Sequence, residues 1–255
     1  MARLFGTDGV RGVAGTELTA QTCFDIGRAA ATVLTTQGKS KPRILIGRDT
    51  RISGDMIEAA LIAGFTSIGA VAIPLGVLPT PALAYLTREY KADASAMISA
   101  SHNPMEYNGI KFFNANGYKL DDELEDKIEA IVRGALHTLD LPNGADIGTI
   151  DHIDTALDDY ISYTLTTVDT RLDGIKAAVD CGNGAASFTA PFALRKLGVD
   201  CTIINDQPNG LNINAGCGST HIEEVTRLVK ETGADIGFAF DGDADRLMAV
   251  DELGN

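Results

Sequence analysis

Short apolar runs alternate with segments of helical periodicity along most of this 255-residue chain. The runs at 44–46, 71–75, 94–98, 177–179 and 236–240 are each followed by a polar or glycine-containing loop, which is typical of buried strands. Between most of these runs, apolar side chains recur every three or four positions, and this spacing predicts amphipathic helices. Strands that alternate with helices favour an α/β fold, in which helices cover the faces of the sheet.

The segments with helical periodicity have recognisable starts and ends. The first predicted helix has Thr19 at its N-cap, carries Cys23, Ile26 and Ala30 on one face and ends near Gly38. Further helices are predicted after Ser53 to residue 65, from about 82, over 124–136, from about 151, over 187–197 and over 222–232. Additional short strands are predicted at 199–204, at 247–250, and at 110–113 after a turn at Asn108-Gly109.

The segment 139–149 has little periodicity and contains Pro142, an Asn143-Gly144 pair and Gly148, as linkers between domains commonly do. We therefore expect one α/β domain over residues 1–145 and a second over residues 151–255. A chain of this length is sufficient for two hydrophobic cores.

The formal net charge of −14 argues against nucleic acid as a partner, because binding to phosphates requires a basic face. An anionic substrate would instead need local basic groups that act against the average field. Candidates in or beside glycine-rich loops are Arg11, Arg48, Lys111 and Arg246.

No apolar stretch is long enough to span a bilayer, and the amino terminus lacks the apolar core of a secretion signal. We therefore expect no membrane association and a cytoplasmic location. The cysteines form no C-x-x-C pair, so neither a zinc site nor a redox motif is indicated, and free thiols are expected at Cys23, Cys181, Cys201 and Cys217.

The loop after the 94–98 run presents Ser101 beside His102, ten residues before Lys111. A serine hydroxyl acts as a nucleophile when a base and a cation assist it, so Ser101 is a candidate phosphoryl acceptor. Lys111 is a candidate general acid or base if its pKa is lowered. The ordinary alternatives are a serine that caps a turn, a structural histidine and a solvated lysine.

Asp241, Asp243 and Asp245 alternate directly after the 236–240 run. In an extended loop this spacing can direct three carboxylates at one point, which suits a hard cation such as Mg²⁺. A calcium loop is disfavoured, because Arg246 occupies the position that needs glycine and a strand precedes the motif. A solvated acidic turn is the other alternative. The carboxyl end of a strand in an α/β sheet is where ligands bind, and this favours the metal site.

Three glycine-containing loops are less specific. The loop over 6–12 could bring its backbone close to a phosphate, or it could be a simple amino-terminal turn. The loop over 47–51 has two arginines, of which one is expected to form a structural ion pair. The loop over 181–184 lacks the full spacing of a dinucleotide fingerprint, so no nucleotide cofactor is predicted.

The Ser-Ala-Ser-His-Asn-Pro segment at 99–104 and the Asp-Gly-Asp-Ala-Asp-Arg segment at 241–246 resemble the phosphoserine loop and the metal loop of the α-D-phosphohexomutases. Two further segments, 5–12 and 212–221, resemble the branch of that family that acts on glucosamine phosphates; the glucose and mannose phosphomutase branches are alternatives. The resemblance implies two α/β/α domains with mixed sheets, corresponding to the amino-terminal half of a four-domain phosphohexomutase.

The resemblance also implies an activity and the residues that carry it. The activity would be the interconversion of glucosamine 6-phosphate and glucosamine 1-phosphate, which feeds the synthesis of UDP-N-acetylglucosamine and of peptidoglycan. It would proceed through a phosphoserine and a bisphosphorylated sugar, with glucose 1,6-bisphosphate or glucosamine 1,6-bisphosphate as activator. By resemblance, the Mg²⁺ ligands are Ser101, Asp241, Asp243 and Asp245, and the general base is Lys111. The resemblance also places Arg11 and Arg246 at the phosphoryl-transfer centre and His102 in the serine loop as a further residue.

Two loops of the family do not occur in this sequence: the sugar-specificity loop Gly-Glu-x-Ser-Gly-His and the phosphate-clamping loop Arg-x-Ser-Gly-Thr. Because phosphoryl transfer depends mostly on positioning, we expect this chain to keep the serine and metal sites but to have little or no mutase turnover. A metal-dependent phosphatase and a non-catalytic domain fragment are the alternatives from other classes. A phosphosugar is the expected partner, and a homodimer is compatible with the sequence.

Overall fold

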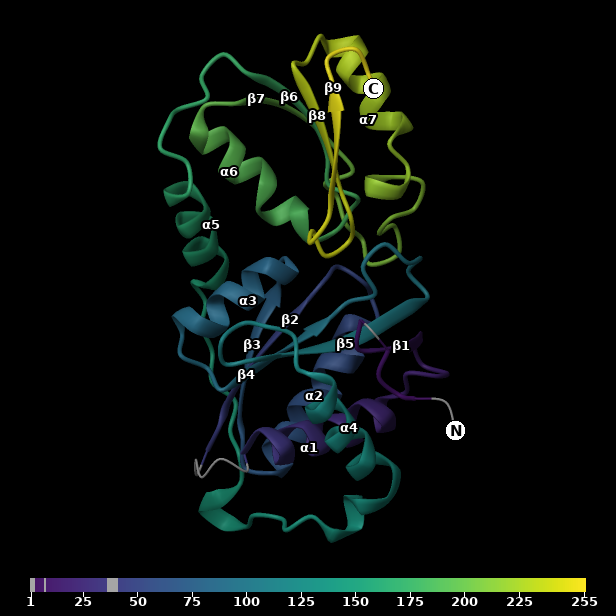
Figure 1. Cartoon of the computed structure of the whole chain (residues 1–255), viewed down its shortest axis with the longest axis vertical. Coiled ribbons are helices and arrows are strands. Elements are labelled where there is room, and N and C mark those ends of the chain that lie inside the picture. Colours follow the sequence, from purple (N-terminus) through teal and green to yellow (C-terminus); the bar gives the residue numbers. More distant parts are fainter. Residues whose placement is uncertain (1–2, 7, 36–40) are drawn as a thin grey trace.

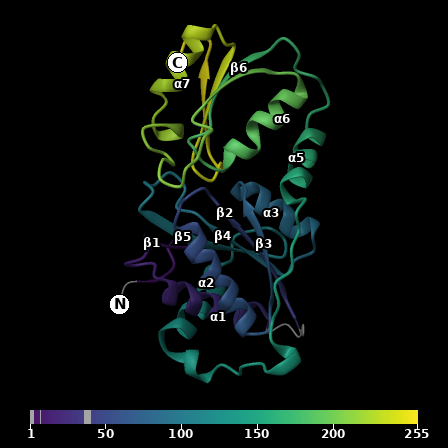
Figure 2. The same ribbon diagram turned by 180° about the vertical axis from the view of Figure 1, so that it is seen from behind.

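The computed structural model describes residues 3–6, 8–35 and 41–255. Figures 1 and 2 show two lobes, each built on a sheet with helices on both faces. We call the lobe with strands β1 to β5 the amino-terminal domain and the lobe with β6 to β9 the carboxyl-terminal domain. The predicted α/β/α architecture is confirmed in both. None of the described helices is long and apolar enough to cross a membrane.

The sheet of the amino-terminal domain is mixed and has the strand order β1-β5-β4-β2-β3. Its strands are β1 (Val10–Val13), β2 (Arg43–Arg48), β3 (Val71–Val77), β4 (Ala94–Ile98) and β5 (Tyr107–Asn114). Strand β2 is parallel to β3 and β4, whereas β5 is antiparallel to both of its neighbours. The carboxyl ends of β2 and β4 therefore lie at the same edge of the sheet, and the loops that follow them are neighbours.

The helices of this domain divide between the two faces of the sheet. Helices α1 (Ala20–Thr35), α2 (Gly54–Ser67) and α4 (Asp122–Ala130) pack into the core on one face, and α3 (Thr80–Glu89) packs on the other. The backbone N–H of Thr22 donates to Thr19 Oγ1 at 3.1 Å, which confirms the predicted N-cap. Gly38, where the end of this helix was predicted, lies outside the described residues.

The carboxyl-terminal sheet has the order β7-β6-β8-β9, with β6, β7 and β8 parallel and β9 antiparallel. Its strands are β6 (Lys176–Asp180), β7 (Asp200–Ile204), β8 (Ile236–Phe240) and β9 (Leu247–Asp251). Helix α6 (Ala190–Leu197) covers one face and α7 (Glu223–Thr232) the other, each over its own apolar cluster. Helix α5 (Ala156–Thr166) connects the domains and packs against both α3 and α6.

The predicted turn at Asn108-Gly109 is wrong, because both residues lie inside β5 and pair with β1. The glycine serves close packing of the chain: a Cβ at Gly109 would lie 2.7 Å from the carbonyl oxygen of Ser99 and 2.8 Å from that of Val10. The asparagine side chain is buried, and its Nδ2 donates to Ser53 Oγ at 2.9 Å. Both residues are explained by contacts with distant segments.

Three predicted helix boundaries also differ. The helix expected from 151 begins at Ala156, because Asp151 N donates to the carbonyl oxygen of Ala72 and extends the edge of the sheet. The helix expected over 124–136 ends as α4 at Ala130 and continues as a π turn (Ile131–Ala135) and a 3₁₀ turn (Leu136–Thr138). The helix expected over 187–197 is divided into a 3₁₀ turn (Ala185–Phe188) and α6.

The segment 139–149 has no strand or α-helix and only a short 3₁₀ turn (Gly144–Asp146), as expected for a linker. It is nevertheless held tightly to the amino-terminal domain, since Gly148 N donates to the carbonyl oxygen of Thr66 at 2.9 Å. The domain limits at residues 145 and 151 stay a prediction. A further 3₁₀ turn (Gly218–Thr220) precedes α7.

Candidate active site

The loop after β4 and the loop after β8 meet at the interface between the two domains. Ser101 Oγ donates a hydrogen bond to Asp241 Oδ2 at 2.7 Å, and both residues are buried. Because each loop starts at the carboxyl end of a strand near the middle of its sheet, the two sheets present their ligand-binding edges to one another. The candidate nucleophile and the candidate metal loop, 140 positions apart in the chain, therefore form one site.

The carboxylates of Asp241, Asp243 and Asp245 converge, since one oxygen of each lies within 4.8 Å of the other two. Burial and the neighbouring Asp241 and Asp245 carboxylates raise the pKa of Asp243 to about 7. Burial and repulsion by Asp241 raise the pKa of Asp245 as well. Among the described residues, the buried Oδ1 of Asp243 has no hydrogen-bond partner. Three converging carboxylates with an unpartnered buried oxygen fit a hard divalent cation such as Mg²⁺.

Arg246 brings positive charge to the hydroxyl of Ser101. Its Nη2 donates to Ser101 Oγ and contacts His102 Nδ1 at 2.8 Å, while its Nε lies 3.3 Å from Asp241 Oδ2. A guanidinium has only donors, so the Nδ1 atom of His102 must accept and carries no proton in this arrangement. The same Nδ1 atom lies 3.4 Å from Ser101 Oγ. His102, Asp241 and Arg246 therefore all contact the hydroxyl of Ser101.

Lys111 and Arg11 are the two remaining candidate site residues, and they lie on strands of the amino-terminal sheet. Lys111 is on β5, and its Nζ is 4.0 Å from Asp245 Oδ2. Arg11 is on β1, and its Nη2 is 3.6 Å from Asp8 Oδ2. The role of Arg11 at the phosphoryl-transfer centre stays a prediction. Thr7, in the same loop, lies outside the described residues.

Arg48, another candidate for anion binding, has carboxylate partners on α2. Its Nη2 is 2.9 Å from Asp55 Oδ1, and its Nε is 3.5 Å from Glu58 Oε2. In the same loop, Arg51 Nε donates to Asp49 Oδ2 at 2.9 Å, and both side chains are fully buried. The expectation that one arginine of this loop forms a structural ion pair is therefore confirmed.

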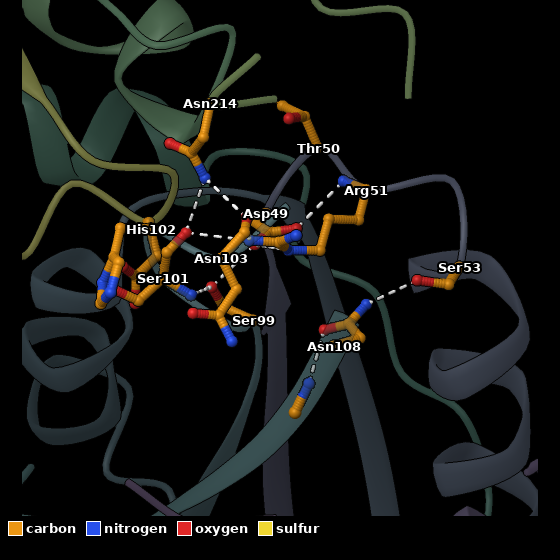
Figure 3. Close-up of polar contacts among 12 residues, drawn as sticks. Asp49, Thr50, Arg51, Ser53, Ser99, Ser101, His102, Asn103, Asn108 and Asn214 are labelled. Atoms are coloured by element: carbon orange, nitrogen blue, oxygen red, sulfur yellow. Dashed lines mark hydrogen bonds and ion pairs between the residues drawn. The ribbon is translucent and has the colours of Figure 1, made fainter. Parts of the chain in front are cut away.

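The structural ion pair turns out to organise the serine loop, which sequence reasoning missed. The Nη2 atom of Arg51 donates to the carbonyl oxygens of Ser101 and Asn103 at 2.9 Å each, and Nη1 donates to that of Pro104 at 2.5 Å. Asp49 also accepts from Ser99 Oγ at 2.7 Å, as Figure 3 shows. The only signal in the sequence was a charged loop after a buried strand.

Thr80 is a second residue that sequence reasoning missed. It is the first residue of α3, in the amino-terminal domain, yet its Oγ1 donates to Asp243 Oδ2 at 2.5 Å and its N–H donates to the carbonyl oxygen of Asp243 at 2.9 Å. These bonds fix one oxygen of the carboxylate and leave Oδ1 for a ligand. The Pro-Thr-Pro start of the helix was the available signal, because it places a hydroxyl beside unpaired backbone N–H groups.

The two loops approach so closely that one position accepts only glycine. A Cβ at Gly242 would lie 2.6 Å from the carbonyl oxygen of Ser101 and 3.0 Å from Asn214 Nδ2. Any other residue at this position would separate the serine loop from the aspartate loop.

Comparisons with known proteins agree with this arrangement. The model for phosphoglucomutase/phosphomannomutase alpha/beta/alpha domain I matches residues 2–137, and the model for domain II matches residues 158–254. A phosphoglucosamine mutase of Clostridium novyi (strain NT) is 58% identical over 255 residues, which are all of this chain and 57% of that protein. The chain therefore spans a little over half the length of this curated relative.

Solved structures share the fold of this chain. A phosphoglucomutase/phosphomannomutase family protein from Burkholderia thailandensis has a TM-score of 0.87 at 28% identity, over 99% of this chain and 55% of that one. An N-acetylphosphoglucosamine mutase from Aspergillus fumigatus, solved with GlcNAc-6P and magnesium, shares the fold with a TM-score of 0.53 at 16% identity, over 99% of this chain and 51% of that one. Because the two family models together match most of its length, the chain belongs to the phosphoglucomutase/phosphomannomutase family, and the matched parts are domains I and II.

Proposed function

We propose that this chain carries the phosphoserine and metal-binding part of a phosphoglucosamine mutase, which interconverts glucosamine 6-phosphate and glucosamine 1-phosphate. The observation that carries the proposal is the hydrogen bond from Ser101 Oγ to Asp241 Oδ2 across the domain interface, within a cluster of three carboxylates. The high identity to a protein of that name supports the choice of sugar.

In this proposal the ligands of a Mg²⁺ ion are Asp241, Asp243, Asp245 and an oxygen on Ser101. When bound, the ion would supply positive charge that stabilises the phosphoryl group during transfer. The unpartnered Oδ1 of Asp243 and the raised pKa of that carboxyl support a cation at this place. A fungal mutase with the same fold was solved with magnesium and a phosphosugar, which is compatible with the proposal.

The residues of the chain would each have a defined role in the transfer from phosphoserine to sugar. The sugar hydroxyl attacks phosphorus, the bond between phosphorus and Ser101 Oγ breaks, and a bond between phosphorus and the sugar oxygen forms. Lys111, as the general base, would take the hydroxyl proton. Arg246, which donates to Ser101 Oγ, would stabilise the negative charge on the leaving serine oxygen. His102 would orient Arg246 through its unprotonated Nδ1.

Turnover by this stretch of 255 residues alone is proposed to be small or absent. The sugar-specificity and phosphate-clamping loops expected from the resemblance do not occur in it. A phosphosugar would then react with the serine without being held for the second transfer, and held geometry accounts for much of such catalysis. A homodimer and a cytoplasmic location stay predictions from the sequence.

The test is phosphosite mapping by intact-mass and peptide mass spectrometry, with Mg²⁺, before and after incubation with glucose 1,6-bisphosphate. We expect one phosphoryl group on Ser101 and none in Ser101→Ala. Ser187→Ala is the matched control, because Ser187 is also a buried serine and is not part of the site. Absence of phosphate from Ser101 under both conditions, with the protein folded, would contradict the proposal.

A further inference from the structure

Asn214, in the loop between β7 and α7, reaches across the domain interface into the serine loop. Its Nδ2 donates to the carbonyl oxygens of Ser101 at 2.9 Å and of Asn103 at 3.1 Å. The same two oxygens accept from Arg51 Nη2 of the amino-terminal domain. Figure 3 shows the serine loop held between these two side chains. Each carbonyl oxygen is therefore shared by a donor from each domain.

The backbone of the serine loop depends on these donors. Ser101 has φ of +55°, in the left-handed region that a serine rarely adopts without support from its surroundings. Its N–H is fixed by Ser99 Oγ at 2.8 Å, and its carbonyl oxygen is fixed by Arg51 and Asn214. With the N–H and the carbonyl of the residue both fixed, its hydroxyl is directed at Asp241.

Asn214 is itself buried within the domain that bears the aspartates. It is 8% exposed, and its backbone N–H donates to the carbonyl oxygen of Gly182 at 2.9 Å. Its side chain lies against Gly242 of the aspartate loop, where a Cβ would be 3.0 Å from Nδ2. The position of its amide therefore follows the position of the aspartate loop.

We infer that Asn214 is a positioning residue whose amide transmits the docking of the carboxyl-terminal domain to the orientation of Ser101. The serine has its productive orientation only while the aspartate loop is in place beside it. The catalytic part of this inference rests on the proposed function, whereas the structural part does not.

The interface offers a matched control for this inference. Thr50 is also 8% exposed, and its Oγ1 donates across the same interface to the carbonyl oxygen of Asn183 at 2.6 Å. Its bond ends on a loop other than that of Ser101. Thr50→Val therefore weakens the interface by one hydrogen bond and leaves both donors of the serine loop in place.

The first experiment measures the initial rate of phosphoryl transfer to Ser101 from glucose 1,6-bisphosphate with Mg²⁺, over a range of bisphosphate concentrations. Asn214→Gly removes the amide and keeps the left-handed backbone accessible, because Asn214 has φ of +55°. Asn214→Asp keeps the side-chain volume and replaces the donor by an acceptor. We expect both variants to lower the maximal rate by about 10- to 100-fold while the half-saturating concentration changes by less than about twofold. Thr50→Val should stay within about threefold of the wild type.

The second experiment needs no phosphosugar. Amide hydrogen exchange over residues 99–105 should be about tenfold faster in Asn214→Gly than in Thr50→Val, while the amides of β7 report on whether each variant is folded. Equal exchange over residues 99–105 in the two variants would overturn the inference. If the wild type accepts no phosphate, the proposed function fails, and the exchange comparison still decides the role of Asn214.

Discussion

Replacing Arg51 by methionine would remove the cation from the centre of the serine loop. In the wild type the guanidinium and Asp49 are both fully buried, with 2.9 Å between Arg51 Nε and Asp49 Oδ2. Methionine fills a comparable volume, but of the described residues it leaves the carboxylate only Ser99 Oγ and the backbone N–H of residue 51 as donors. The carbonyl oxygen of Pro104 also loses the Nη1 donor.

The cost can be estimated from these contacts. Removing one partner of a buried ion pair typically costs about 3–5 kcal/mol. The partly buried carbonyl of Pro104, which loses its donor, adds about 1 kcal/mol. The expected loss of about 4–6 kcal/mol is a large part of the roughly 5–15 kcal/mol that stabilises a folded protein. It should lower the midpoint of thermal unfolding by roughly 10–20 °C.

The effect should also depend on pH. Burial raises the pKa of the Asp49 carboxyl, and the Arg51 guanidinium and the hydrogen bonds counteract part of that rise. Without Arg51 the pKa rises further, so the folded variant binds more protons than the unfolded chain. The stability that the Asp49 carboxyl contributes is then fully present below its pKa in the unfolded chain, and it is lost as pH rises through its pKa in the folded protein. The deficit relative to the wild type should therefore be smaller near about pH 5 than near about pH 8.

Thermal and urea unfolding followed by circular dichroism would measure these differences. Arg171→Met is the matched control, because Arg171 and its ion-pair partner Asp173 are both 64% exposed, so the free energy of unfolding should change little. Adding Asp49→Asn to Arg51→Met should recover about 2 kcal/mol, since the unpaired charge is removed. A loss below about 1 kcal/mol for Arg51→Met, or no recovery in the double variant, would refute the reasoning.

Three further predictions concern the contact between the loops and the metal site. Gly242→Ala should lower phosphoryl loading of Ser101 by more than about tenfold, because the new Cβ would meet the serine carbonyl. The control Gly134→Ala should match the wild type, because open space surrounds its new Cβ. Mg²⁺ should raise the midpoint of thermal unfolding, with a larger gain near about pH 8 than near about pH 5.5. The reason is that the pKa of Asp243 is raised to about 7, so its ionisation destabilises the metal-free chain as pH rises. An equal gain at both pH values would contradict this. Thr80→Val should weaken Mg²⁺ binding by about tenfold in calorimetric titration, because Asp243 loses its 2.5 Å hydrogen bond from the threonine hydroxyl. Unchanged affinity would exclude the idea that Thr80 orients the Asp243 carboxylate.

Much of the fold and of the candidate site could be predicted because the signals are local. The apolar run at 94–98 and the run at 236–240 form β4 and β8 at the same limits, since a buried strand needs only consecutive apolar residues and a polar end. Ser101 and the three aspartates follow these strands directly, and the carboxyl ends of parallel strands are where ligands gather. Their candidate roles could therefore be predicted before their neighbours in the structure were known.

The remaining features depend on contacts between distant segments, and the sequence pattern does not record those. Asn108-Gly109 has the composition of a turn, yet the glycine is there because Ser99 and Val10 leave no room for a Cβ. Arginine is usually found at the protein surface, yet Arg51 is fully buried beneath the serine loop.

The residues proposed to carry the chemistry can be predicted from the sequence alone, because alternating apolar runs and the loops that follow them are local properties of the chain. How those residues are held depends on tertiary contacts. Thr80 and Asn214 each fix a group of the opposite domain, and within the described part of the chain the hydrogen bonds of their side chains end in that domain. Their partners lie more than a hundred positions away, and only packing of the two domains brings them within hydrogen-bond distance.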